Sequence, residues 1–258
     1  MKKLFLFTTL IVVVVLVVSC STKDAIELEP VDLIIENETS DASRASCGAA
    51  VNFKDLVVET SWISGETGDR DTFDACGVDG KSWMDKYNSG VVMMKCLKGK
   101  GHRTELKEEP GSESSLLKRK KLEFTAKYTR IAKNGVTIAQ IHNRGSGVRR
   151  PWVRVYIDDD RYVKIKETRT NPTGSSSSYN TFIGPKYTSG DNLTVRVLTS
   201  KGKAKFRITT AGEIWNKTVQ PSSSWSSKSD SYYLKAGVYT EGSDKTPTVK
   251  YSAFTITH

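Results

Sequence analysis

Short alternating or apolar runs, separated by clusters of Gly, Ser, Asn, Asp and Pro, make up the chain from residue 46 onward. An alternation with a period of two is typical of strands that bury one face, and no long helical stripe competes with it. The clearest predicted strands are 91–97, 121–131, 136–142, 152–157, 162–167, 193–198, 204–210, 231–240 and 248–256. This number of strands predicts an all-β fold, a jelly-roll sandwich of two antiparallel sheets with a concave groove.

The strand 232–241, YYLKAGVYTE, has an unusual polar face. Its alternation places Leu234, Ala236 and Val238 on one side. The opposite side carries two phenols, an amine and a glycine: Tyr233, Lys235, Gly237 and Tyr239. Such a face is either an ordinary half-buried surface with amphipathic tyrosines or a platform on which a flat, charged ligand can lie.

Two other strands have the same form. In RTELK (103–107), Arg103, Glu105 and Lys107 share one face, and Leu106 lies behind them. In QIH (140–142), Gln140 and His142 share a face, and the isoleucine between them points to the core. A charged strand face is usually solvated and a single His is usually structural, but three such faces together indicate one polar side of a sheet.

The N-terminus has the features of an export signal. Lys2 and Lys3 precede an apolar run that ends at Ser19-Cys20. The run is short for a membrane span, and VVSC resembles a bacterial lipobox in which Cys20 is lipidated. We therefore predict a lipoprotein signal peptide over 1–19 and a protein that is exported and lipid-anchored to the outer membrane or cell surface. The alternative is a short membrane anchor.

Charge divides the remaining chain into two parts. Residues 20–45 contain seven acids and two bases and are rich in Ser, Thr and Asn, which predicts a flexible acidic linker. The whole chain has a formal net charge of +10, so that residues 46–258, the predicted folded domain, are strongly basic. A basic surface favours a polyanion such as nucleic acid, acidic glycan or anionic lipid. Export and the lack of nucleic-acid-binding motifs argue against nucleic acid.

The cysteines and acids give few signs of metal binding. Lipidation of Cys20 leaves Cys47, Cys76 and Cys96, which allow one disulfide and one free thiol without fixing the pair. The histidines lie in no zinc-binding spacing. The triplet Asp158 to Asp160 is interpreted as a hairpin turn, because other oxygen ligands for calcium are not evident nearby.

Two Ser-rich segments, 171–180 and 221–230, interrupt the predicted strands. Low complexity usually indicates a solvated loop. In a protein that holds a long polymer, such segments can also act as lids over a cleft.

The motifs RTELK, IAQIH (138–142) and YYLKAGVY (232–239), in this order, resemble the three signature regions of polysaccharide lyase family 7, the alginate lyases of jelly-roll fold. The resemblance extends over most of residues 46–258, including FIGPKYTSGDNLTV (182–195). It implies an active site of Arg103, Gln140, His142 and Tyr239. Family positions that hold substrate correspond to Glu105, Lys107 and Lys235, and we add Tyr233 and Arg154 as substrate-binding residues.

The resemblance implies cleavage of a 4-linked uronate polymer by β-elimination, with no metal or organic cofactor. Expected partners are an acidic polysaccharide such as alginate and the membrane through the lipid anchor, with no nucleic acid and a monomeric chain. In the family the QIH form is associated with guluronate-containing blocks. The chain departs from the family pattern at Lys107, where arginine is common, and at Thr240-Glu241, where Asn-Gln is usual. A related uronan such as glucuronan, or a non-catalytic jelly roll that binds acidic glycan, is therefore the alternative.

Overall fold

The computed structural model describes residues 51–258 except 67–69, 88–89, 171, 175 and 243. The predicted signal peptide, the lipidation site Cys20, the acidic linker and Cys47 lie outside the described residues. No helix in the described part of the chain is long and apolar enough to cross a bilayer.

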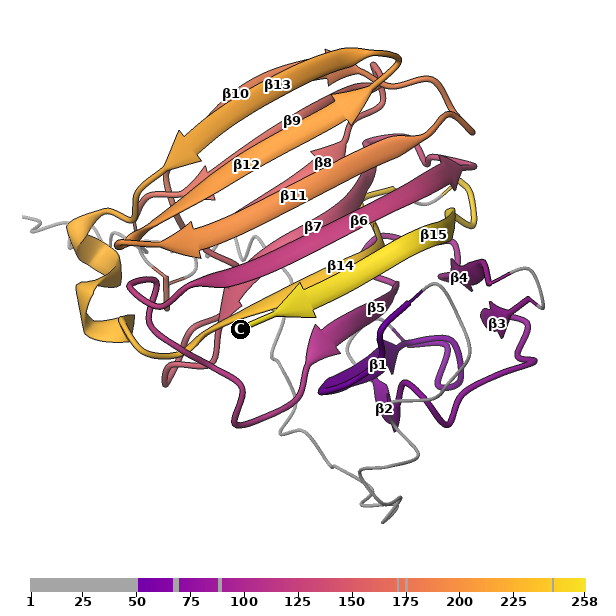
Figure 1. Ribbon diagram of the computed structural model, residues 1–258, viewed down its shortest axis with the longest axis horizontal. Helices are drawn as coiled ribbons and strands as arrows, with labels where there is room; N and C mark the ends of the chain where they lie inside the picture. The colour runs from indigo at the N-terminus through magenta and orange to yellow at the C-terminus, as the bar shows by residue number, and fades with distance from the viewer. Residues whose placement is uncertain (1–50, 67–69, 88–89, 171, 175, 243) are drawn as a thin grey trace, which may run out of the picture.

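Two antiparallel sheets pack face to face (Figure 1). The eight-stranded sheet has the order β10 (Tyr179–Lys186), β9 (Tyr162–Thr168), β8 (Val153–Ile157), β7 (Val136–Asn143), β14 (Tyr232–Thr240), β5 (Arg103–Glu108), β1 (Leu56–Thr60) and β2 (Asp71–Asp74). The seven-stranded sheet has the order β13 (Glu213–Val219), β12 (Lys203–Thr210), β11 (Leu193–Ser200), β6 (Lys120–Thr129), β15 (Thr248–Thr257), β4 (Val92–Lys95) and β3 (Met84–Lys86). The prediction of an all-β jelly-roll sandwich is confirmed.

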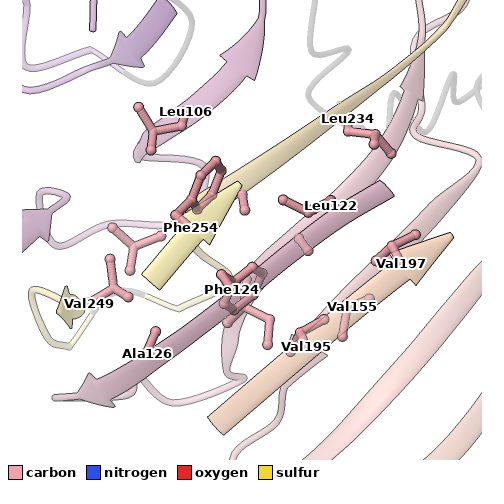
Figure 2. Close-up of a cluster of buried hydrophobic side chains, with 14 of the residues drawn as sticks. Leu106, Leu122, Phe124, Ala126, Val155, Val195, Val197, Leu234, Val249 and Phe254 are labelled. Atoms are coloured by element: carbon pink, nitrogen blue, oxygen red, sulfur yellow. The ribbon is translucent and has the colours of Figure 1, made fainter. Parts of the chain in front are cut away.

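The hydrophobic core fills the space between the sheets. Phe124 of β6 stacks on Phe254 of β15, with ring centroids 6.2 Å apart. Figure 2 shows these rings together with Leu106 of β5 and Leu234 of β14, the apolar residues of the strands predicted to carry the polar face. Because neighbouring residues of a strand point to opposite sides, burial of these leucines directs the polar residues of β5 and β14 away from the seven-stranded sheet.

The long predicted strands correspond to observed strands, whereas several short or edge strands were not predicted. These are β1, β2, β3, β10 and β13. β13 is an edge strand with a mostly exposed side-chain pattern, so it lacks the alternation that marks a half-buried strand. β10, the edge of the other sheet, contains Gly184 and Pro185, which normally indicate a turn. β1 carries a charged residue, Glu59, inside an apolar run.

The Ser-rich segment 221–230 is anchored to the core by one residue, whereas its other described side chains are partly or fully exposed, as expected of a solvated loop. It contains the 3-10 helix η1 (Ser223–Lys228). Trp225 of η1 is buried and donates a hydrogen bond from its indole nitrogen to the Thr168 carbonyl oxygen at 2.8 Å. Composition concealed this anchor because one large aromatic side chain fixes a segment that is otherwise made of serines. In the other segment, Tyr179 and Asn180 begin β10.

Asp158 to Asp160 form the turn that connects β8 to β9, as predicted. The Asp158 carboxylate accepts a hydrogen bond from the Tyr162 amide at 2.7 Å and pairs with Lys164.

Cys76 is disulfide-bonded, and Cys96 is a buried free thiol.

Candidate active site

β14 lies between β5 and β7, so the three sequence motifs occupy three neighbouring strands. Tyr239 is the cross-strand partner of Arg103. Lys235 is the partner of Lys107 on one side and of Gln140 on the other. The polar face of this part of the sheet, turned away from the core, is called the site face below.

Gly237 allows the close approach of β14 and β5 at the centre of the site face. A Cβ atom at this position would lie 2.3 Å from the Thr104 carbonyl oxygen and 2.5 Å from the Glu105 Cα atom. Any side chain here would therefore push the two strands apart. The glycine between Lys235 and Tyr239 thus has a packing function, because it allows β14 and β5 to lie close together.

Four charged groups form a ring of alternating sign on the site face. Arg103 Nη1 lies 3.6 Å from Glu59 Oε1 and 3.8 Å from Glu105 Oε2. Lys235 Nζ lies 3.5 Å from Glu59 Oε1 and 3.8 Å from Glu105 Oε2. The exposed fraction of each of these side chains is 3% or less, so the ring is almost completely desolvated. The sequence had suggested an open polar surface, and the structure shows a packed layer of charges instead.

Glu59 is the main anion of this layer, and the sequence analysis missed it. Its Oε2 atom accepts a hydrogen bond from Lys107 at 2.7 Å, and Arg70 approaches Oε1 to 3.8 Å. Burial raises the pKa of Glu59, but the charges of Lys235, Lys107 and the two arginines outweigh burial and hold this pKa well below its usual value. Glu59 is therefore ionised at neutral pH. In the sequence, the sign of a buried charge at this position was a single acid within the otherwise uncharged segment Leu56–Thr60.

Gln140 and His142 are both oriented by neighbours. The Gln140 amide nitrogen donates to Glu105 Oε1 at 2.5 Å, which leaves its second N–H hydrogen for another acceptor. His142 Nδ1 lies 2.8 Å from the Asn143 amide nitrogen and 3.2 Å from the Asn143 carbonyl oxygen. An amide N–H can only donate and a carbonyl can only accept, so Asn143 offers a partner to either neutral tautomer of His142.

Asn143 is fixed in turn by the loop after β7 and by η1. Its side chain donates to the Lys228 carbonyl oxygen at 2.7 Å and accepts from the Gly145 amide at 2.7 Å. The Ser-rich segment thus supports the strand end that carries His142.

Two tyrosines complete the site face, each beside an arginine. The Arg103 guanidinium lies 4.3 Å from the ring centroid of Tyr239, and the Arg144 guanidinium lies 4.4 Å from that of Tyr233. The Tyr233 ring also packs against His142, with centroids 5.4 Å apart. Tyr233 is buried, whereas Tyr239 is partly exposed and can meet a ligand that approaches from solvent.

Arg154 lies in the adjacent strand β8, opposite Gln140. Its guanidinium pairs with the Glu241 carboxylate at 2.7 Å, and the Thr137 hydroxyl donates to the same carboxylate oxygen at 2.7 Å. The acid that replaces the family's usual residue after Thr240 is therefore neutralised locally.

The arrangement can neutralise an anion and move a proton. Three cations, Arg103, Lys107 and Lys235, outnumber the two carboxylates Glu59 and Glu105, and low local solvation strengthens the excess positive charge. A phenol and an imidazole, which are common proton carriers, lie on the same face.

Among the described residues, one group of three carboxylates is close enough to hold a cation, Asp158 to Asp160, and it contains none of the predicted site residues.

Comparison with known proteins gives a family and a fold. A family model described as alginate lyase matches residues 51–258. No curated protein matches the sequence significantly. Among solved structures, the alginate lyase A1-II′, a member of polysaccharide lyase family 7, is similar with a TM-score of 0.63 and 16% identity over 82% of this chain and 98% of that chain.

Two further solved structures have the same fold. An alginate lyase from Klebsiella pneumoniae has a TM-score of 0.64 and 16% identity, covering 84% of this chain and 98% of that one. The alginate lyase AlyC3, solved with dimannuronate, has a TM-score of 0.63 and 13% identity, covering 80% and 90%. At these identities the structures establish the shared fold, whereas the family model spans all the described residues. The chain therefore belongs to the alginate lyase family, polysaccharide lyase family 7, and is a polysaccharide lyase.

Proposed function

We propose that this protein cleaves alginate by β-elimination and releases unsaturated oligouronates, with guluronate-containing or mixed blocks favoured. The observation that carries the proposal is that Arg103, Tyr239, Gln140 and His142 come together on one face of three neighbouring strands. A variant of lyase A1-II′ in which a histidine and a tyrosine are replaced is solved with a substrate, GGMG. That pair of residue types agrees with the proposed roles of His142 and Tyr239.

The first chemical requirement is neutralisation of the uronate carboxylate. Elimination removes the proton at C5, next to a carboxylate whose charge opposes formation of a second, enolate-like charge. Arg103 and the second N–H of Gln140 donate hydrogen bonds to this carboxylate, and His142 assists when Nε2 carries the proton. Each preorganised donor of this kind contributes roughly 10²- to 10³-fold in rate.

The second requirement is proton transfer. Tyr239 protonates the leaving O4 atom and, as phenolate, takes the C5 proton when both lie on the same side of the sugar. His142 takes the C5 proton when it lies on the opposite side. That role needs an unprotonated Nε2, and Nδ1 then donates to the Asn143 carbonyl oxygen in place of accepting from the Asn143 amide. Acid–base catalysis of this kind contributes roughly 10²- to 10⁴-fold.

Glu105, Lys107, Lys235, Tyr233 and Arg154 hold the substrate or order the groups that do. Lys107 and Lys235 are buried in the charged layer, so they act mainly through the field that they create at the site face. Arg154 is partly exposed and is the member of this set best placed to meet a neighbouring sugar of the polymer.

The lipobox supports a further part of the proposal, that the enzyme is exported and held at the outer membrane or cell surface through lipid on Cys20. We also propose that the enzyme is monomeric. Cys20→Ser should release the full-length protein from the membrane fraction of the expressing cells. Retention of this variant in that fraction would favour a membrane anchor formed by the apolar run itself.

Ultraviolet absorbance tests the activity directly, because each elimination creates a conjugated unsaturated uronate. The protein is mixed separately with polyguluronate, polymannuronate and glucuronan. A larger rise with polyguluronate supports the proposed preference, and a rise only with glucuronan changes the substrate while keeping the mechanism. Absorbance that stays flat on all three polymers, with glycan binding retained, would favour the non-catalytic alternative.

Two variants test the residue roles. Tyr239→Phe and His142→Ala should each lower kcat by roughly 10²-fold or more while the protein stays folded. Tyr87→Phe, which changes an exposed tyrosine outside the motifs, is the matched control and should retain full turnover. Wild-type turnover by Tyr239→Phe would remove Tyr239 from the mechanism.

A further inference from the structure

We propose that the polymer site extends from the catalytic residues across β8 and β9 to the edge strand β10, where Arg150, Lys166 and Tyr179 bind a uronate carboxylate. This inference rests on the proposed function and adds a binding site to it. The three residues are called the distal cluster.

A continuous cross-strand row connects the catalytic residues to the distal cluster. Gln140 is opposite Arg154, Arg154 is opposite Lys166, and Lys166 is opposite Thr181. Directly paired residues point to the same side of a sheet, so this row continues the site face. Strands lie about 4.8 Å apart, and the three steps from β14 to β9 therefore cover about 14 Å. A 4-linked pyranose unit advances a polymer by a length similar to one strand spacing, so each strand can receive about one sugar.

The distal cluster is held together by its own contacts. Tyr179 precedes Thr181 by two residues and so lies on the same side of β10 as the row. Lys166 Nζ lies 4.1 Å from the Tyr179 ring centroid. Arg150 donates from Nη1 to the Tyr179 hydroxyl oxygen at 2.6 Å and from Nε to the Gly174 carbonyl oxygen at 3.4 Å. Tyr179 thus orients two cations toward one place.

The charge of Lys166 has no acid partner in the part of the chain that the structure describes. Among the described residues, no carboxylate lies within ion-pair distance of Lys166, and the Glu241 carboxylate is paired with Arg154. Burial is the largest cause that lowers the pKa of Lys166, and the charges of Arg154 and Arg150 add to it, while Glu241 opposes it. A uronate carboxylate bound here would relieve this repulsion, which is the behaviour expected of an anion site.

The length dependence of turnover tests the inference. Initial rates are measured with the full chain on an alginate trisaccharide and on an alginate octasaccharide. Cleavage at Tyr239 leaves at most two sugars of the trisaccharide, about 10 Å, on the side toward Lys166, which is too short to reach it, whereas the octasaccharide spans the distance. For the double variant Lys166→Ala/Tyr179→Ala, the ratio of kcat/KM on the octasaccharide to kcat/KM on the trisaccharide should fall about tenfold, through KM, because a hydrogen bond to a charged group is lost. Lys166→Ala alone, a change at a partly exposed position, should give a smaller fall in the same direction.

Lys205→Ala is the matched control, since it removes an exposed lysine from β12 of the other sheet. It should leave the ratio at the wild-type value. A ratio that stays unchanged in the double variant, or rates that fall equally on both oligosaccharides, would overturn the distal site. Wild-type protein that turns over neither oligosaccharide would instead refute the proposed function, and the distal site with it.

Discussion

Glu59 provides the sharpest test of how the site face is built. Glu59→Gln replaces a buried carboxylate by an amide of nearly the same shape and removes one negative charge. The carboxylate oxygens lie 2.7 Å from Lys107 Nζ, 3.5 Å from Lys235 Nζ and 3.6 Å from Arg103 Nη1. Removing one partner of a buried ion pair costs about 3–5 kcal/mol, because the remaining charges stay desolvated and uncompensated. We expect Glu59→Gln to lower the free energy of unfolding by this amount at neutral pH.

The pH dependence of this effect has a defined sign. The pKa of Glu59 in the folded protein is well below its usual value of 4.5, so its charge stabilises the fold fully above that value. This stabilisation is lost as the pH falls through the lower folded-state pKa. The stability difference between wild type and Glu59→Gln should therefore be largest above about pH 5 and shrink on acidification toward about pH 3.

Urea denaturation of both proteins across this pH range measures the difference, and kcat/KM on alginate reports the effect on Arg103. Glu123→Gln is the matched control, because Glu123 is a partly exposed carboxylate that pairs with Lys121 at 2.9 Å on the other sheet. Such a surface pair contributes about 0–1 kcal/mol. If Glu59→Gln were no less stable than Glu123→Gln at neutral pH, Glu59 would not be the anion that holds the cations together.

Three other predictions concern packing and the cysteines. Gly237→Ala should separate β14 from β5 and lower both stability and kcat, measured by urea denaturation and initial rates; wild-type values would mean that the strands adjust freely. Trp225→Ala should lower the free energy of unfolding, measured by urea denaturation, by about 3–5 kcal/mol because it leaves a cavity at a buried position, and Trp225→Phe should lower it by a smaller amount. Equal losses in the two variants would mean that the lost indole hydrogen bond alone accounts for the effect. Burial raises the pKa of Cys96, so the native protein should resist thiol alkylation at this residue until it unfolds, and rapid labelling of Cys96 in the native protein would contradict this expectation. A reductant that opens the Cys76 disulfide should lower Tm, and an unchanged Tm would show that the disulfide does not stabilise the fold.

The sequence by itself determined the fold class and the three central strands of the site. Alternation is a local property, and β14 shows it clearly because Leu234 and Ala236 must enter the core while Lys235 cannot do so without partners. The ordered motifs likewise predicted that Arg103 and Tyr239 would come together. The long β6 and β15 were predicted for the same reason, since their buried and exposed residues alternate over most of their length.

Only the tertiary structure decided which charges are buried and what balances them. Glu59 is 44 residues before Arg103 along the chain, and it meets that residue because β1 pairs with β5, a long-range pairing that no local pattern contains. The same limit hid Trp225 among serines and the edge strand β10, where exposure removes the hydrophobic alternation. Strand order places Lys166 in line with Gln140, with Tyr179 of β10 beside Lys166, and it therefore decides how far the site face extends. Local periodicity determines which side of a strand faces the core, whereas the pairing of distant strands determines which side chains become neighbours.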